Sequence, residues 1–261
     1  MSTTSNRGAN YEVYWSRLQE SSRYHPANRF RYFLIASRLR RYLKPGMSLL
    51  DMGCGDARLL LRLRSRWPQN RFAGCDISHK VIGYNREQHP GIEFFQADVS
   101  ARDLAERASE TSRSGFDIVI CSEVIEHVED DRGLLQNAAA LLAPGGYLIL
   151  TTQSGPQYRI DFELVHHLRH YRRTDLEGLV RAEGLEIVES FNCGFPVLNL
   201  QKIVANAMMD TVMRSTASSE KPPGIVRAIM LIMYVLMRFS PKWSGPQIFI
   251  AARRQEAVLA R

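Results

Sequence analysis

Short apolar runs alternate with longer segments of helical spacing from residue 47 onward, and this alternation constrains the fold more than any other feature. Strands that alternate with helices of about 10–15 residues are typical of βαβ units, which build parallel sheets with helices on both faces. We therefore predict an α/β fold. The predicted strands are Ser48–Met52, Arg71–Asp76, Ile92–Ala97, Phe116–Cys121, Tyr147–Thr152, Leu185–Phe191 and Gln247–Ala252. The predicted helices between them are Ala57–Trp67, Ser78–His89, Arg102–Arg113, Arg132–Leu142 and Thr174–Glu183.

Proline and glycine mark the ends of several of these helices. Pro68 and Pro90 each follow a helical segment, and Pro144-Gly145-Gly146 stops a third one. Thr174 is the predicted N-cap of the last helix and Gly184 stands at its C-terminal end.

Two segments lie outside this alternation and predict additions to the sheet domain. Residues 1–46 contain helical spacing over Asn28–Leu43. Residues 196–245 are too long for a plain connection, so we expect helices in them, over Gln201–Met213 and Ile225–Phe239. The predicted division is a basic N-terminal helical cap (1–46), a central domain (47–195 with 246–254) and a hydrophobic helical insertion (196–245).

The net charge of +7 is concentrated in the N-terminal segment. Residues 1–46 hold 9 basic and 2 acidic side chains, and the rest of the chain holds 25 of each. Basic segments bind phosphates, so RNA is a candidate partner. No RNA-binding module is recognisable, so nucleic acid is not the expected partner, and an anionic substrate or an anionic membrane surface stays open.

Composition excludes several protein classes. An apolar content of 45% excludes disorder of the whole chain. Residues 1–10 lack the apolar core of a secretory signal, and the longest apolar run, Ala228–Met237, is far shorter than a membrane-spanning helix of about 20 residues. The four cysteines lack paired metal-ligand spacing, so we expect reduced thiols in a cytoplasmic protein, with peripheral membrane contact and a homo-oligomer left open.

A glycine-containing loop follows the first predicted strand and suggests a cofactor site. Gly53 and Gly55 allow a tight turn and close approach of a ligand. Asp51 precedes this loop, while Asp76 and Asp98 end the next two strands. Carboxylates suit a cofactor that carries positive charge and no phosphate, with Asp76 on a ribose diol and Asp98 on an adenine amine; S-adenosylmethionine has these properties. The structural alternative is that Asp51 caps the loop and Asp76 caps the following helix.

The motifs together resemble those of class I S-adenosylmethionine-dependent methyltransferases over about residues 45–192. The matching segments are 50–55 (Leu-Asp-Met-Gly-Cys-Gly), 74–78 (Gly-Cys-Asp-Ile-Ser), 96–99 (Gln-Ala-Asp-Val), 116–127 (Phe-Asp-Ile-Val-Ile-Cys-Ser-Glu-Val-Ile-Glu-His) and 142–148 (Leu-Ala-Pro-Gly-Gly-Tyr-Leu). Glu-Val-Ile-Glu-His and residues 167–173 are most similar to the branch with quinone-biosynthesis O-methyltransferases and bacterial small-molecule and lipid methyltransferases. Ala57 replaces the third glycine of the family.

The resemblance implies a Rossmann-like, seven-stranded, mostly parallel sheet whose last strand is antiparallel, with the cofactor at the carboxyl ends of the strands. The implied cofactor-binding residues are Asp51, Gly53, Gly55, Asp76, Ile77, Asp98, Val99 and Cys121. The thiols of Cys54, Cys75 and Cys121 are expected to be small buried groups near the pocket, without a redox or nucleophilic role.

Methylation of a hydroxyl also needs a base, and the first candidates follow the fourth strand. In a helical turn Glu123 would face both Glu126 and His127, so that a carboxylate could orient the imidazole or two carboxylates could hold a cationic acceptor. The alternative is that Glu126 and His127 only begin a helix.

The second group of candidates is His166, His167, His170 and Tyr171. In a helix His166 and His170 would share one face, which is metal-ligand spacing, but no third ligand is evident and we expect no metal. His167 or His170 is a candidate acid or base. The neighbouring arginines, Arg169, Arg172 and Arg173, either dock this loop or bind an anionic group.

The two additions to the sheet domain, residues 1–46 and 196–245, each have several candidate functions. The N-terminal helix is expected to pack on the sheet with a basic outer face, and Tyr11, Tyr14 and Trp15 are candidates for a lid. The methionine-rich insertion suits a substrate cap, a pocket for an acyl or prenyl chain, a membrane-surface contact or a dimer face.

We therefore predict a methyltransferase that O-methylates a small, hydroxylated and partly hydrophobic metabolite. The alternatives are nitrogen or carbon methylation, RNA as substrate, or a non-catalytic binding protein with the same fold. The Asn/Asp-Pro-Pro-Tyr/Phe motif of nucleic-acid amine methylation is absent after the fourth strand, which argues against DNA as substrate.

Overall fold

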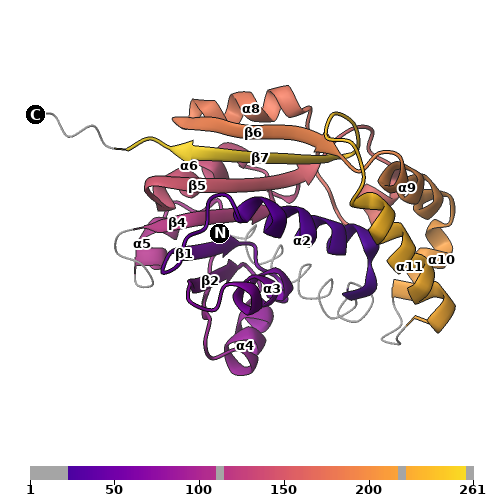
Figure 1. Cartoon of the computed structure of the whole chain (residues 1–261), viewed down its shortest axis with the longest axis horizontal. Helices are drawn as coiled ribbons and strands as arrows, with labels where there is room; N and C mark the ends of the chain where they lie inside the picture. Colours follow the sequence, from indigo (N-terminus) through magenta and orange to yellow (C-terminus); the bar gives the residue numbers. More distant parts are fainter. Residues whose placement is uncertain (1–22, 110–114, 217–221, 257–261) are drawn as a thin grey trace, which may run out of the picture.

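One mixed sheet organises the molecule. The computed structural model of the chain describes residues 23–109, 115–216 and 222–256. In these residues seven strands pair in the order β3-β2-β1-β4-β5-β7-β6, and β7 alone runs antiparallel to its neighbours (Figure 1). This arrangement confirms the predicted mostly parallel sheet with an antiparallel last strand.

The strands and helices follow the predicted alternation closely. The strands are β1 (Ser48–Met52), β2 (Arg71–Asp76), β3 (Glu93–Gln96), β4 (Phe116–Ser122), β5 (Leu142–Gln153), β6 (Leu185–Cys193) and β7 (Gln247–Arg254). The helices are α2 (Pro26–Leu39), α3 (Arg58–Arg66), α4 (His79–Gln88), α5 (Leu104–Ser109), the short 3-10 helix η1 (Ile125–His127), α6 (Asp131–Leu141), α7 (Arg159–Glu163), α8 (Arg173–Ala182), α9 (Val197–Ala207), α10 (Met209–Thr216) and α11 (Gly224–Met237). The proposed lid residues Tyr11, Tyr14 and Trp15 lie outside the described residues.

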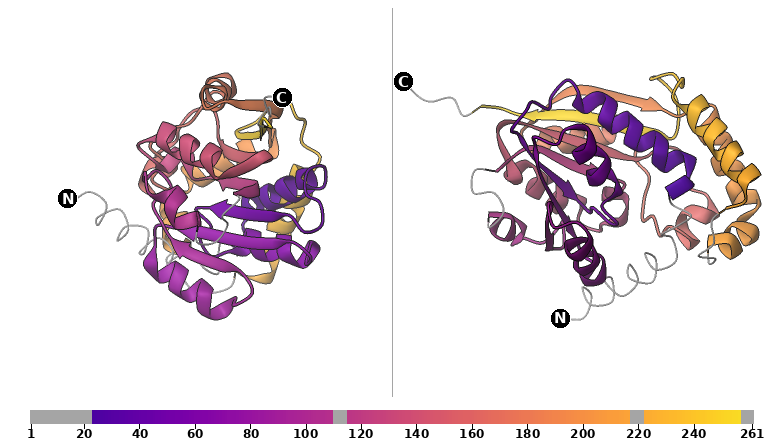
Figure 2. Two further views of the ribbon diagram at one scale, coloured as in Figure 1. Left: turned by 90° about the vertical axis from the view of Figure 1, so that its left-hand side faces the viewer. Right: turned by 60° about the horizontal axis from the view of Figure 1, so that its bottom comes forward.

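Helices cover both faces of the sheet, as the alternation predicts (Figure 2). One face packs its apolar side chains, including Leu50 and Met52 of β1, against α5, α6 and α8. The other face, which includes Leu49, packs against α2, α3 and α4. Because successive residues of a strand point to opposite faces, one apolar strand such as β1 contributes to both clusters.

One predicted strand start and one predicted helix cap are wrong. α6 ends at Leu141 as expected, but β5 starts at Leu142 rather than at Tyr147, so Pro144-Gly145-Gly146 lies inside the strand. Leu142 already pairs with Phe116, and a register shift after Phe116 accommodates the extra residues. Thr174 is not the N-cap of α8: the helix starts at Arg173, and the Thr174 hydroxyl donates to Asp175. Gly184 does end this helix with a positive φ of 74°.

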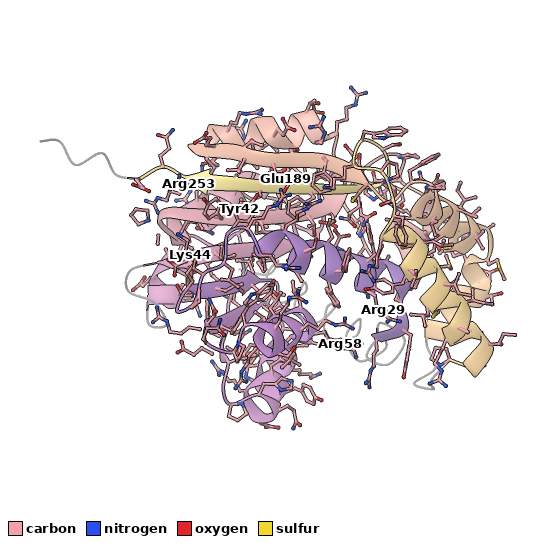
Figure 3. All side chains as sticks on the ribbon, in the orientation of Figure 1. Arg29, Tyr42, Lys44, Arg58, Glu189 and Arg253 are labelled. Carbon is pink, nitrogen blue, oxygen red and sulfur yellow. The ribbon has the colours of Figure 1, made fainter. Side chains whose placement is uncertain are left out.

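The predicted basic outer face of α2 is only partly correct. Arg40 and Arg41 are exposed, but Arg38 is buried, 3.6 Å from Glu189 of β6, and its guanidinium lies over the Phe191 ring. Figure 3 shows Glu189 at the outer strands of the sheet, beside α2. Arg31 points to the carboxyl edge of the sheet, where it lines the cavity described below. Since apolar and basic residues interleave in this helix, the pattern alone does not show which arginines face inward.

The insertion contains three helices rather than the two predicted, because the first predicted segment breaks at Met208. Figures 1 and 2 show α9, α10 and α11 gathered at the end of the molecule toward which the parallel strands run, with α11 beside α2. Within the described residues, no helix combines the length and the apolar character that crossing a membrane requires.

Candidate functional site

A cavity of about 560 Å³ lies at the carboxyl ends of the parallel strands. Its floor comes from the segments that follow β1, β2, β3 and β4, and its walls include α2, α7, α9 and α11. A volume in this range suits a cofactor or a metabolite. The predicted site residues on its wall are Asp51, Gly53, Asp76, Ile77, Asp98, Val99, Glu123, His127 and His167.

The loop after β1 depends on Gly53. Its φ of 76° is unfavourable for other residues, and a Cβ atom at this position would lie 2.5 Å from the Val124 side chain. The Gly53 and Cys54 amides both donate to the Cys75 carbonyl, at 2.8 and 2.9 Å. The loop is therefore pressed against β2 and against the segment after β4, and its backbone faces the cavity.

Asp76 holds this loop in place. Its carboxylate accepts from the Gly55 and Ser78 amides, both at 3.0 Å. Ser78 itself caps α4 by accepting from Val81, so the alternative that Asp76 caps this helix is wrong, although Asp76 does hold the local backbone. Each carboxylate oxygen retains a second acceptor site, so the structural role leaves Asp76 able to bind a ligand hydroxyl.

Two predicted cofactor-binding residues do not line the cavity. Gly55 lies behind the loop, where its carbonyl accepts from Asn85 at 2.7 Å. Cys121 is fully buried in the core under β4, and burial raises the pKa of its thiol well above the ordinary value. All four cysteines are free and buried, which agrees with the structural role expected for them.

Asp51 is a buried carboxyl group without a close cation to compensate its charge. Burial, and then repulsion from Asp76, raise its pKa to about 8, and Arg31 partly opposes this. The Arg31 guanidinium is itself 3.7 Å from Glu123, and no hydrogen-bond partner of its buried Nε atom is found in the described part of the chain. A cationic ligand beside Asp51 would favour the ionised carboxylate.

Glu123 follows β4 in a left-handed conformation, with φ of 56°. Such backbone is costly for a residue other than glycine and persists only where surrounding contacts enforce it. Here Gln247 donates to Oε1 at 2.8 Å and Gln153 donates to Oε2. Both oxygens are engaged, and the expected contact with Glu126 or His127 in a helical turn is not formed.

Glu126 lies behind the cavity rather than on its wall. It is fully buried and accepts from the Thr152 hydroxyl at 2.8 Å, while its backbone carbonyl accepts from the Leu168 amide. Burial, and then repulsion from Glu123, raise the pKa of Glu126 well above its ordinary value. Through these two contacts Glu126 ties the loop around Leu168 to the sheet; it lies with His127 in η1, and neither residue begins α6.

His127 and His167 meet at the cavity wall. Their rings lie edge to face, with centroids 4.8 Å apart. Burial lowers the pKa of His127 to about 4. Burial also lowers the pKa of His167, to about 2, with further contributions from His127, His170 and Lys202. Both imidazoles are therefore neutral near pH 7.

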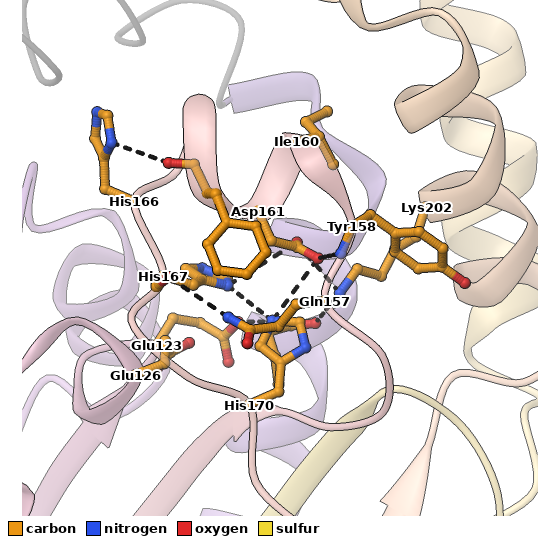
Figure 4. Close-up of polar contacts among 12 residues, drawn as sticks. Glu123, Glu126, Gln157, Tyr158, Ile160, Asp161, His166, His167, His170 and Lys202 are labelled. Carbon is orange, nitrogen blue, oxygen red and sulfur yellow. Dashed lines mark hydrogen bonds and ion pairs between the residues drawn. The ribbon is translucent and has the colours of Figure 1, made fainter.

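The tautomers of His167 and His170 follow from their partners (Figure 4). His170 Nδ1 lies 3.3 Å from the Gly155 carbonyl, which only accepts, so Nδ1 carries the proton and Nε2 is the acceptor. His167 Nδ1 lies 3.0 Å from that Nε2 and must donate to it. In a neutral ring this leaves Nε2 of His167 as a proton acceptor.

Asp161 stands behind this pair. Its carboxylate lies 3.9 Å from His167 Nδ1, 3.8 Å from His170 Nε2 and 3.4 Å from Lys202 Nζ. The Tyr158 amide also donates to it, at 2.8 Å. A buried carboxylate at this distance stabilises an imidazolium that forms on either histidine.

The predicted pairing of His166 with His170 does not occur. α7 ends at Glu163, and His166 follows it with φ of 57°, its Nδ1 3.1 Å from the Phe162 carbonyl. His166 is exposed and does not line the cavity. The pairing fails because the segment is not a continuous helix.

In the described part of the chain, two sets of side chains have metal-ligand spacing: Glu126, His127 and His167, and Asp161, His167 and His170. Each set contains one carboxylate that already has a partner, because Thr152 donates to Glu126 Oε2 and the Lys202 ammonium lies beside Asp161. The absence of a metal stays a prediction.

Sequence reasoning missed several residues of the site. Asp161, Lys202 and Arg31 line the cavity, and Gln153 and Gln247 hold Glu123. Asp161 and Lys202 lie in the segments after β5 and β6, where no motif marks them. Gln153 and Gln247 stand at the facing ends of β5 and β7, a position that the predicted strand pairing could have indicated.

Residues 27–190 match the family described as "Methyltransferase domain". The ubiquinone biosynthesis O-methyltransferase of Burkholderia vietnamiensis is 28% identical over 160 residues, which are 55% of this chain and 66% of that protein. A methyltransferase of Mycobacterium tuberculosis, named as uncharacterised, is 32% identical over 113 residues, 42% of this chain and 53% of that protein. The chain spans between about half and two thirds of the length of these relatives.

Solved structures with the same fold include methyltransferases and one enzyme named for another reaction. The phosphoethanolamine N-methyltransferase 2 of Haemonchus contortus, solved with S-adenosyl-L-methionine, has a TM-score of 0.55 at 16% identity and covers 88% of this chain and 57% of that chain. An S-adenosylmethionine-dependent methyltransferase of Mesorhizobium loti has a TM-score of 0.53 at 18% identity, covering 84% and 96%. The [4+2]-cyclase SpnF has a TM-score of 0.56 at 15% identity, covering 86% and 81%. These similarities concern the fold alone.

Proposed function

Because this chain belongs to the methyltransferase-domain family and is a class I S-adenosylmethionine-dependent methyltransferase, we propose that it methylates a hydroxyl oxygen of a small, partly hydrophobic metabolite. The printed activity of the ubiquinone biosynthesis O-methyltransferase of Burkholderia vietnamiensis agrees with this choice of atom. The observation that carries the proposal is the neutral His167 on the cavity wall, backed by His170 and Asp161.

The cavity residues fit the cofactor. Asp51 and Asp76 are buried carboxylates whose pKa values burial raises, so a cationic ligand would favour their ionised forms. Gly53 leaves room for close approach, and Asp98, Ile77 and Val99 line the same cavity. We assign Asp51 to the positively charged end of S-adenosylmethionine, Asp76 to its ribose and Asp98 to its adenine.

His167 is our choice for the base. When bound, the cofactor supplies a methyl group that its sulfonium makes electrophilic. His167 accepts the hydroxyl proton at Nε2 and keeps its Nδ1–H bond to His170. The Asp161 carboxylate, 3.8–3.9 Å from the two rings, then stabilises the imidazolium. Proton removal of this kind contributes roughly 10²- to 10⁴-fold to a rate when the pKa of the base lies near the working pH, so the proposal requires that the pKa of His167, about 2 in this structure, rises when the acceptor binds.

The other predicted candidates are less suited to the role. Glu126 is off the cavity, and its carboxyl group already accepts from the Thr152 hydroxyl. Both oxygens of Glu123 are engaged by Gln153 and Gln247. His170 already donates from Nδ1 to Gly155 and accepts from His167 at Nε2, so we assign it a positioning role. His127 packs its ring on His167 and helps to exclude water.

The acceptor is inferred from the remaining wall of the cavity. Apolar side chains come from α7, α9 and α11 and the segments beside them, namely Ile160, Leu164, Val165, Leu198 and Met230. Two cations, Arg31 and Lys202, lie on the same wall. Such a surface favours an acceptor with an apolar body and an oxygen that becomes negative as its proton leaves, such as a phenol with an alkyl or prenyl chain.

The expected setting of the protein remains part of the proposal. Free, buried thiols support the cytoplasm, a reducing compartment. We retain the division into a cap (1–46), a cofactor-binding domain (47–195 with 246–254) and an insertion (196–245), since α2, α9 and α11 each contribute to the cavity wall. A small-molecule acceptor and no nucleic acid remain the proposed partners.

The test uses a matched pair of acceptors, an alkyl-substituted phenol and the aniline of the same carbon skeleton, with S-adenosylmethionine carrying a labelled methyl group. We expect label on the phenol oxygen, at a rate that is insensitive to salt and unaffected by added tRNA. Transfer to the aniline alone would support nitrogen methylation instead, and strong salt inhibition with label on tRNA would support RNA as substrate.

A further inference from the structure

α11 exposes an apolar stripe that the rest of the described chain does not cover. Ile225, Ile229, Ile232, Leu236 and Phe239 are 52–81% exposed. Their spacing of four, three, four and three residues places them along one line of the helix. We call these five side chains the outer stripe of α11.

The opposite side of α11 packs against the rest of the protein. Met237 is buried in the core beside the sheet, Tyr234 packs against that core, and Met230 lines the cavity. Apart from Arg227, α11 is therefore apolar on both its inner and its outer side, a property of helices that are buried on all sides or that lie in a membrane. The inner side faces protein, so the outer stripe requires a partner of its own.

Charge around the stripe indicates the kind of partner. Between Pro222 and Gln255 the sequence contains no Asp or Glu. Arg227 and Arg238 lie on the inner side of α11, where their guanidiniums stand over the Tyr24 and Phe33 rings. The exposed Trp243 and Lys242 follow the helix. Apolar side chains followed by an aromatic residue and a cation, in a segment without carboxylates, match the headgroup and acyl boundary of an anionic lipid surface.

We propose that the outer stripe of α11 docks the enzyme on an anionic lipid bilayer. Fourteen residues rise about 21 Å, and the inner side stays packed on the protein, so the helix lies along the surface. Because Met230 on the inner side belongs to the cavity wall, docking brings the cavity next to the acyl region. An acceptor with an apolar chain then reaches the site from the bilayer. The docking surface itself does not depend on which atom is methylated.

The test is co-flotation of the full chain with vesicles of phosphatidylcholine, with and without phosphatidylglycerol. The wild type is expected to bind the vesicles that contain phosphatidylglycerol. Ile232→Asp and Phe239→Asp are expected to bind at least tenfold more weakly, and Lys242→Gln roughly fivefold more weakly on the anionic vesicles alone. Tyr84→Asp is the matched control, since Tyr84 is a half-exposed aromatic residue on α4, away from α11 (Figure 1), and it should bind like the wild type.

Thermal unfolding and titration with S-adenosylmethionine keep this proposal separate from the proposed activity. Retained folding and cofactor binding with lost vesicle binding support the docking surface. Equal vesicle binding by all variants, or no binding by the wild type, overturns it. Light scattering that shows a wild-type dimer and a monomeric Ile232→Asp variant, without vesicle binding, would instead assign the stripe to a second copy of the chain.

Discussion

His167 donates from Nδ1 to Nε2 of His170 across 3.0 Å. The partners of His170 leave that ring no other tautomer, because its Nδ1 faces the Gly155 carbonyl. The lone pair of His167 is thereby fixed on Nε2 by two residues that need not touch the acceptor. The orientation of the base is thus set by the loop between β5 and α8.

His167→Ala should lower kcat by roughly 10²- to 10⁴-fold, because a base in the transition state contributes about that much. Cofactor affinity should change little, since the cofactor is assigned to the Asp51 side of the cavity. His166→Ala is the matched control: His166 is the adjacent residue, is exposed and does not line the cavity. Steady-state kinetics of the two variants measure the two kcat values. An equal loss of kcat in both variants would exclude His167 as the base.

Gly53→Ala should destabilise the protein by about 1–3 kcal/mol and weaken cofactor binding. The alanine would have to adopt φ near 76°, with its Cβ 2.5 Å from Val124. Gly83→Ala is the control, because a Cβ at this helical position meets no atom within 4 Å, and alanine should stabilise α4 by about 0.5–1 kcal/mol. Chemical denaturation and calorimetric titration of both variants measure the effects. A neutral Gly53→Ala variant contradicts the assigned role of the loop.

Cofactor binding near pH 7 should release a proton from Asp51. Its pKa of about 8 leaves the carboxyl largely protonated in the free protein, and the positive charge of the cofactor favours ionisation. Calorimetric titrations in two buffers of different ionisation enthalpy give the number of protons released, which we expect to approach one. Asp51→Asn should release none. If the Asp51→Asn variant still released a proton on binding the cofactor, that proton would have to come from another group.

Stability should fall as the pH rises from about 6.5 to 8. The folded pKa of Asp51, about 8, exceeds its ordinary value of 3.8, so the folded state binds more protons than the unfolded state in this range. The stabilisation is complete at pH values below the pKa of Asp51 in the unfolded state. It is lost as the pH rises through the pKa of Asp51 in the folded state, at up to about 1.4 kcal/mol per pH unit for each such group. Denaturant unfolding at several pH values measures the slope, which Asp51→Asn should reduce. A slope of opposite sign would contradict the assigned burial.

The sheet was predictable because the residues that specify each strand lie within or directly beside that strand. Each buried strand is a short apolar run closed by glycine, proline or an acidic residue, and β1 and β2 were predicted to the residue. The break at Met208 and the strand that starts at Leu142 were not predictable, because they depend on tertiary pairing and packing rather than on residue preference.

The site was predictable only on its cofactor side. Asp51, Gly53 and Asp76 lie at strand ends, where topology brings them together. The proposed base region combines Arg31, Asp161 and Lys202 from three segments that no periodicity connects, and the backbone of Glu123 is left-handed rather than helical. A prediction that treats residues 123–127 and 166–170 as helices does not contain either feature.

The most direct test of the account follows a trideuterated methyl group from S-adenosylmethionine into a lipid extract incubated with the full chain. We predict that mass spectrometry finds the label on an oxygen atom of an organic-soluble product, with the wild type and His166→Ala but not with His167→Ala. Label on nitrogen or carbon, or equal labelling by His167→Ala, would contradict the proposed O-methylation with His167 as its base.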